Sequence, residues 1–151
     1  MNYLDNPIVF LLFWLAMWCA ICLTLSVWGG WYVLAKYYRA TQPFNGKLWH
    51  FRSASFFRSG AIRPASYGGC LTFGACTEGL YISAMLPFRL GHPPLFVPWS
   101  DIGGIETYHQ LFLSSVRFRF TKVPFVACKI SNGLAAAVSQ ESHGHFSISN
   151  S

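Results

Sequence analysis

A hydrolase needs a Ser or Cys nucleophile, a His base and an acid brought together. Residues of these types lie in the second half of the chain: Ser100 and Asp101 are adjacent, with His92 before them and His109 after them. No Gly-x-Ser-x-Gly elbow frames any serine, and Asp101 before Ile102 is typical of a turn or cap residue. The pattern therefore predicts a protein that is not an enzyme.

Possible metal ligands are also present, but their spacing is not that of a zinc site. His143 and His145 form one close pair, and Cys70, Cys76 and Cys128 are the cysteines outside the apolar N-terminal region. Zinc sites usually present two close pairs, such as Cys-x-x-Cys. We therefore expect buried cysteines, solvated histidines, and neither a metal nor another cofactor.

Two further cysteines lie in the apolar N-terminal region. Cys19 and Cys22 have the spacing of a redox motif, but no strand precedes them, so we interpret them as packing residues. With Ser26 and Gly30 they line one stripe of the helix predicted there. Because small residues allow close helix–helix approach in membranes, the stripe predicts a contact with another helix, in a homo-oligomer or a larger complex.

Charge divides the chain into unequal parts. Of the 151 residues, 53% are hydrophobic and only 11% are charged, against about 25% charged in soluble proteins. No charge occurs between Asn6 and Ala35, and about 20 apolar residues are enough to span a bilayer. Asn6 can cap a helix and Pro7 tolerates its first position. The sequence predicts a transmembrane helix over residues 7–35 after a short outside N-terminus, residues 1–6.

All eleven basic residues follow this apolar block, and six of them lie between Lys36 and Arg63 with no acid among them. Lys and Arg near a membrane end are retained in the cytoplasm. We therefore expect a single-pass protein of the cell (inner, cytoplasmic) membrane, with its N-terminus outside and residues 36–151 cytoplasmic. The start MNYLD lacks the basic residues of a cleaved signal peptide. The residues expected at the membrane interface are Trp28, Trp31, Tyr32, Lys36, Tyr37, Tyr38 and Arg39.

After a basic connector over residues 36–47, the pattern changes to short β-prone segments. They recur every eight to twelve residues, which is typical of an antiparallel sandwich or barrel. Val116, Phe118 and Phe120 alternate with arginines, as in a half-buried strand. Ser131 or Asn132 then caps an Ala-rich segment. We predict a mainly-β domain over residues 48–142 that ends in a short helix, and a disordered tail over residues 143–151.

Two segments carry a resemblance to a known family. Glu78–Ser83 (EGLYIS) and Leu95–Ile102 (LFVPWSDI) resemble the corresponding run in GRAM-like and bacterial pleckstrin-homology-like domains. The whole chain is similar to small uncharacterised bacterial membrane proteins with one N-terminal helix and such a domain. The resemblance implies a pleckstrin-homology-like fold for residues 48–142. It implies no particular activity, and the Arg-x-Arg run that phosphoinositide-binding members carry early occurs here only at Arg117–Arg119.

These features predict a non-enzymatic, membrane-tethered binding or adaptor module. The alternative is an accessory subunit of a larger membrane complex, assembled through the transmembrane helix. The expected partners are membrane lipid and an unidentified protein, and not nucleic acid, because a tethered domain meets lipid first. The basic region either sets topology alone or also contacts lipid. The residues expected to contact lipid or a partner are Lys47, Arg52, Arg58, Arg63, Phe88, Arg89, Arg117 and Arg119.

Overall fold

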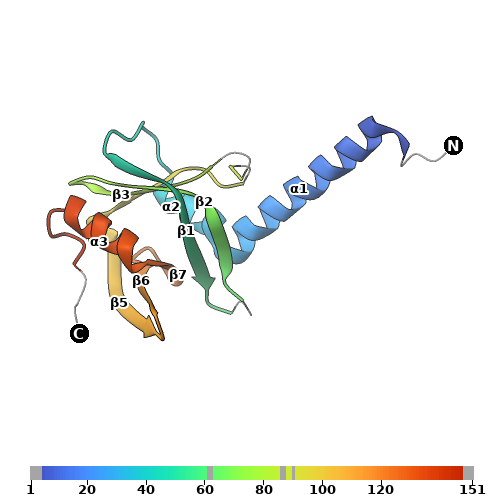
Figure 1. Cartoon of the computed structure of the whole chain (residues 1–151). Helices are drawn as coiled ribbons and strands as arrows, with labels where there is room; N and C mark the ends of the chain where they lie inside the picture. Colours follow the sequence, from blue (N-terminus) through green and yellow to red (C-terminus); the bar gives the residue numbers. More distant parts are fainter. Residues whose placement is uncertain (1–4, 61–62, 86–87, 90, 148–151) are drawn as a thin grey trace.

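The long N-terminal helix extends out from the domain, with part of its C-terminal half packed against it. The computed structural model describes residues 5–60, 63–85, 88–89 and 91–147. Helix α1 (Pro7–Gly29) begins at the predicted cap, where the Asn6 side-chain oxygen accepts a hydrogen bond from the Ile8 N–H at 3.0 Å. It extends away from the domain, with large apolar side chains exposed along most of its length (Figure 1). Its 23 residues make it about 35 Å long.

The expected single helix over residues 7–35 is two helices in the structure. Gly30 has a φ of 85°, and its N–H bonds back to the Val27 carbonyl, which ends α1. Helix α2 (Trp31–Tyr38) starts at the next residue. It is amphipathic and buries Trp31, Leu34 and Tyr38, spaced three and four residues apart, whereas α1 is apolar on all sides. The C-terminal part of the expected membrane helix therefore belongs to the domain core.

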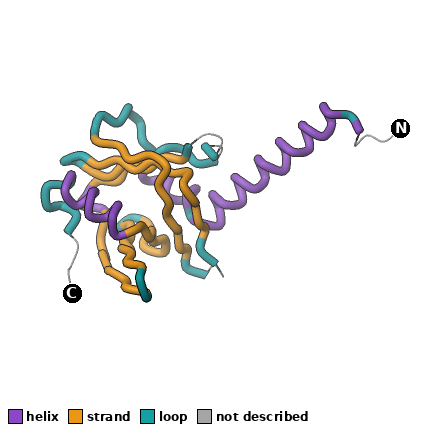
Figure 2. The backbone as a smooth tube through the Cα atoms, in the orientation of Figure 1, coloured by secondary structure: helices purple, strands orange, loops and turns teal. Residues whose placement is uncertain are grey.

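A seven-stranded antiparallel sheet forms the body of the domain, as the sequence predicted in outline. Its strand order is β4-β3-β2-β1-β7-β6-β5. Residues 54–56 of β1 pair with β2 on one side and β7 on the other, so this strand joins the two halves of a curled half-barrel (Figure 2). The strands are β1 (Lys47–Arg58), β2 (Ala65–Ala75), β3 (Gly79–Ala84), β4 (Leu95–Pro98), β5 (Ile102–Gln110), β6 (Leu113–Phe120) and β7 (Val123–Ser131).

The two short helices pack on the sheet and join one continuous apolar core. Helix α3 (Asn132–Glu141) follows β7 directly, and the Ser131 hydroxyl caps it by accepting the Leu134 N–H at 3.3 Å. Its buried side packs against β2, β6 and β7. Helix α2 contacts β4, which is one of the two edge strands of the sheet. The predicted alternation in β6 is confirmed, because Val116, Phe118 and Phe120 are buried and Arg119 is exposed.

The prediction of a disordered tail over residues 143–151 is wrong for the first residues of that segment. Phe146 is fully buried, and its ring centroid lies 5.7 Å from that of Phe118 and 6.0 Å from that of Trp99. Its N–H donates to the Ser142 hydroxyl at 2.9 Å. Phe146 is the one aromatic residue of this tail, and burial of its ring holds the described part of the tail on the domain. Residues 148–151 lie outside the described part of the chain.

Replacing Phe146 with Ala is expected to lower the free energy of unfolding by about 3–5 kcal/mol, because the substitution leaves a cavity in the core. Phe112→Ala is the matched control, since Phe112 is fully exposed. We expect it to change stability by less than about 0.5 kcal/mol. Urea unfolding of the full chain in detergent micelles, followed by circular dichroism, measures both. Equal midpoints for the two variants would show that Phe146 is not a core residue.

Candidate functional site

The C-terminal end of α1 is held against the domain by polar contacts from the end of β1 and from the loop that follows it. The Arg58 guanidinium at the end of β1 donates from Nη1 to the Val27 carbonyl at 2.9 Å. The Trp28 indole N–H donates to the Arg63 carbonyl at 2.7 Å. Because a helix end carries a partial negative charge on its free carbonyls, an arginine is well suited to this position. The junction therefore fixes the direction in which α1 leaves the domain.

The small-residue stripe predicted to meet another helix lies instead against the chain's own domain. Cys22 and Ser26 are buried, and the Ser26 hydroxyl donates to the Gly91 carbonyl at 2.6 Å. A Cβ on Gly29 would come within 2.7 Å of the Ala65 Cβ. Small side chains allow close approach to a sheet as readily as to a helix, so the pattern could not distinguish the two. The predicted residues involved are Cys22, Ser26 and Gly30, whereas Cys19 stays partly exposed.

The residues expected at the membrane interface fall into two groups. Trp31 and Tyr38 are buried in the domain: the Trp31 indole donates to the Pro93 carbonyl at 2.9 Å, and the Tyr38 hydroxyl accepts the Lys122 N–H at 3.1 Å. Burial raises the pKa of Tyr38 above its ordinary value. These two rings therefore belong to the core and not to the surface. The exposed members of the set are Trp28, Tyr32, Lys36, Tyr37 and Arg39.

The basic residues closest to the end of α1 come from the end of β1 and the loop that follows it. Arg58 and Arg63 meet the last turn of α1 as described, whereas Phe88 contacts α1 about three turns earlier, where its ring centroid lies 5.0 Å from that of Trp18. The Arg89 side chain donates to the Ala84 carbonyl at 3.3 Å. At the end of α1 the structure thus brings together two of the eight residues predicted to contact lipid or a partner, Arg58 and Arg63, while Phe88 meets α1 nearer its middle. Lys47, Arg52, Arg117 and Arg119 lie elsewhere, on β1 and β6.

The residues considered for catalysis have separate partners. The buried His92 Nε2 is 2.8 Å from the Tyr67 hydroxyl, and burial raises the pKa of that tyrosine, which keeps it protonated. Asp101 pairs with Lys122 at 3.6 Å, and His109 bonds to Ser114 at 3.0 Å. Ser100 is exposed.

Of the cysteines proposed as metal ligands, Cys128 is fully buried, and burial raises the pKa of its thiol. Cys70 and Cys76 are partly exposed. His143 and His145 are exposed beside the end of α3. Within the described ranges, no three His, Cys, Asp or Glu side chains lie close enough to hold a metal ion.

The hairpin tip between β5 and β6 is a surface that sequence reasoning missed. The side chains of Leu111, Phe112 and Leu113 are 101%, 100% and 78% exposed. Figure 1 shows this end of the hairpin on the side of the domain opposite to α1. Strand periodicity conceals such a tip, because apolar residues in a β-prone run are expected to turn alternately inward. Three consecutive large apolar residues just before Ser114 and Ser115 were the available signal.

Comparison with known proteins returned no relative: no protein-family model matches the chain, and no curated protein is similar to it in sequence. The geometry of the junction and of the hairpin tip therefore carries the functional argument. The first surface is basic and adjoins a helix long enough to cross a membrane, whereas the second is apolar and distant from that helix.

Gly30→Ala is expected to disturb the junction, because the added methyl would lie 2.6 Å from a Val126 methyl and because a φ of 85° is unfavourable for alanine. We expect a loss of about 2 kcal/mol or more in stability. Gly133→Ala is the control, since it lies in the first turn of α3 with open space around it. Thermal unfolding of the full chain in detergent compares them. A Gly30→Ala variant as stable as Gly133→Ala would contradict the described junction.

Proposed function

We propose that this chain is a non-enzymatic, membrane-tethered binding module that holds a protein partner at the tip of its β5–β6 hairpin. The exposure of Leu111, Phe112 and Leu113 is the observation that carries the proposal. Three adjacent large apolar side chains on a hairpin leave apolar area in water, and contiguous patches of this kind mark interaction sites. Aromatic and aliphatic anchors of this type dominate the energy of protein interfaces.

The direction of α1 argues that this partner is a protein and not the bilayer. At about 35 Å, α1 is longer than the roughly 30 Å hydrocarbon core of a membrane, and its side chains are apolar. A bilayer that holds α1 lies on the side of the domain from which the helix leaves (Figure 1). The hairpin tip points away from that side, so the proposed partner approaches from the aqueous phase.

The charges support the same orientation. Arg58 and Arg63 adjoin the domain end of α1, while the described residue before its other end, Asp5, is acidic. Under the positive-inside rule, the N-terminus then faces outward and the domain is cytoplasmic, in the inner membrane of a cell. The half-barrel followed by α3 supports the further proposal that the domain is pleckstrin-homology-like (GRAM-like), as in small bacterial single-pass proteins.

The role of an accessory subunit assembled through the membrane helix has less support. Such assembly depends on small residues that let two helices approach closely. Most of the stripe that would serve this purpose, Cys22, Ser26 and Gly30, is already buried against the chain's own domain. We therefore favour partner binding through the domain.

A photoreactive benzoylphenylalanine in place of Phe112, in the full chain and in the cells that make it, is expected to form one discrete protein adduct. The double change Leu111→Ser and Leu113→Ser should lower its yield at least tenfold, because it removes the flanking anchors. The same probe at Phe51, which is also exposed, is the control. An adduct of twice the 17.0 kDa chain mass would make the partner a second copy. Lipid adducts alone, or the same species from Phe51, would contradict the proposal.

Protease added to sealed vesicles tests the orientation. We expect the domain to be cleaved in inside-out vesicles, where the cytoplasmic face is accessible, and to be protected in right-side-out vesicles. A cleavage site added at Thr77, which is exposed between β2 and β3, gives a defined fragment on a gel. The opposite protection pattern would show that the domain faces outward and that Arg58 and Arg63 do not set the topology.

A further inference from the structure

We infer that the groove between the last turns of α1 and the end of β1 binds one phospholipid with a negatively charged headgroup. This inference rests on the insertion of α1 that is part of the proposed function, and it concerns a different surface from the hairpin tip. It assigns the basic residues of the junction a ligand of defined chemistry. If α1 is inserted as proposed, a groove that it partly forms opens toward the bilayer. Lipid molecules then surround the groove and are its most abundant possible ligands.

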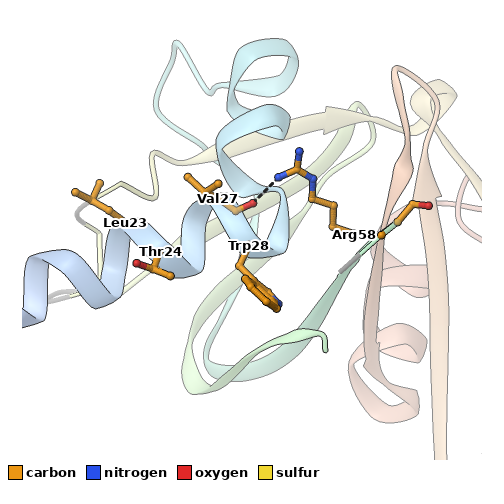
Figure 3. Close-up of a pocket in the computed structure, with 7 residues that line it drawn as sticks. Leu23, Thr24, Val27, Trp28 and Arg58 are labelled. Atoms are coloured by element: carbon orange, nitrogen blue, oxygen red, sulfur yellow. Dashed lines mark hydrogen bonds between the residues drawn. The ribbon is translucent and has the colours of Figure 1, made fainter. Parts of the chain in front are cut away.

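The groove has an apolar wall and a polar end. Its volume is about 740 Å³, which is the size range of small-molecule sites. Leu23, Val27 and Trp28 of α1 are exposed along it, while Ser59 and Gly60 follow the end of β1. Figure 3 shows the Arg58 side chain reaching from β1 to the last turn of α1. The apolar wall therefore lies toward the membrane span, and the polar groups lie at its domain end.

This order of groups matches the order of groups in a phospholipid. In an inserted helix, Leu23 and Val27 lie within reach of acyl chains, one turn apart. Trp28 lies at the end of α1, and indole rings favour the level of the headgroups. Arg58 is at the same level, because it bonds to the Val27 carbonyl. A guanidinium has five N–H donors, and this contact uses one nitrogen, so others are free to meet a phosphate.

Charge favours an anionic headgroup over a zwitterionic one. Arg58 lines the groove, Arg63 adjoins it through the bond from the Trp28 indole to its carbonyl, and no acid is among the residues that line it in the described part of the chain. All five acidic residues lie elsewhere. Asp101 pairs with Lys122, Glu141 with Lys47, and Glu106 accepts from the Tyr108 hydroxyl. Asp5 precedes the far end of α1, and Glu78 lies before β3.

The test measures lipid retained by the full chain in a non-ionic detergent. Phosphatidylglycerol and phosphatidylcholine with identical acyl chains are titrated separately, and native mass spectrometry counts the lipids that stay bound. We expect one phosphatidylglycerol bound about tenfold more tightly than phosphatidylcholine. Arg58→Gln should abolish that preference, whereas Arg119→Gln should keep it, since Arg119 is exposed on β6.

A second variant keeps the test informative if Arg58→Gln does not fold. Ser59→Glu changes an exposed residue of the same groove and places a negative charge where the phosphate is expected. It should reduce phosphatidylglycerol binding about tenfold and leave phosphatidylcholine binding unchanged. Full phosphatidylglycerol preference in this variant, or no preference in the native chain, would overturn the lipid site.

Alkaline carbonate extraction of membranes separates this result from the proposed function. A chain that resists extraction but shows no lipid preference loses only the groove assignment. A chain that carbonate releases from the membrane lacks the inserted helix, and both proposals then fail together.

Discussion

The left-handed turn at Gly30 is the constraint on which the arrangement of this protein depends. It ends α1 and starts α2 without any linker, so a helix of membrane length passes directly into the core of a β domain. The position needs glycine for two independent reasons: the φ of 85°, and the Val126 side chain that would touch any Cβ. Trp31, the next residue, is already fully buried. The domain therefore has little freedom to rotate about the end of the helix.

This rigidity gives the domain two distinct ends. Near the end of α1, the chain presents Arg58, Arg63 and an apolar groove; at the far end, it presents the hairpin tip of Leu111, Phe112 and Leu113. A flexible linker would let either surface reach lipid or protein. With the junction fixed by contacts from Ser26, Trp28 and Arg58, the two surfaces stay at different ends of the domain, and in the proposed orientation they face different phases. The proposed division into lipid contact and partner contact follows from that geometry.

Sequence patterns predicted most of the fold but only part of the site. Hydropathy predicted α1, the alternation of apolar residues predicted β6, and the cap at Ser131 predicted α3, because each of these signals depends on local sequence. Trp31 and Tyr38 were assigned to the membrane interface, since an aromatic residue beside an apolar helix suits lipid and core equally. The burial of Phe146 and the exposure of Phe112 depend on packing between distant segments. No spacing rule in one sequence reports such contacts.

The few acidic residues of this chain lie away from the junction between α1 and the domain. Three of its five acids contact side chains of the domain surface away from the junction, and none lines the groove in the described residues. The positive charge of Arg58 and Arg63 is therefore unopposed by acidic residues where α1 ends. Each basic group near an anionic bilayer contributes about 1 kcal/mol of attraction. In the proposed orientation, this attraction acts on the same side as the inserted helix, so electrostatics and the Gly30 turn favour a single placement of the domain on the membrane.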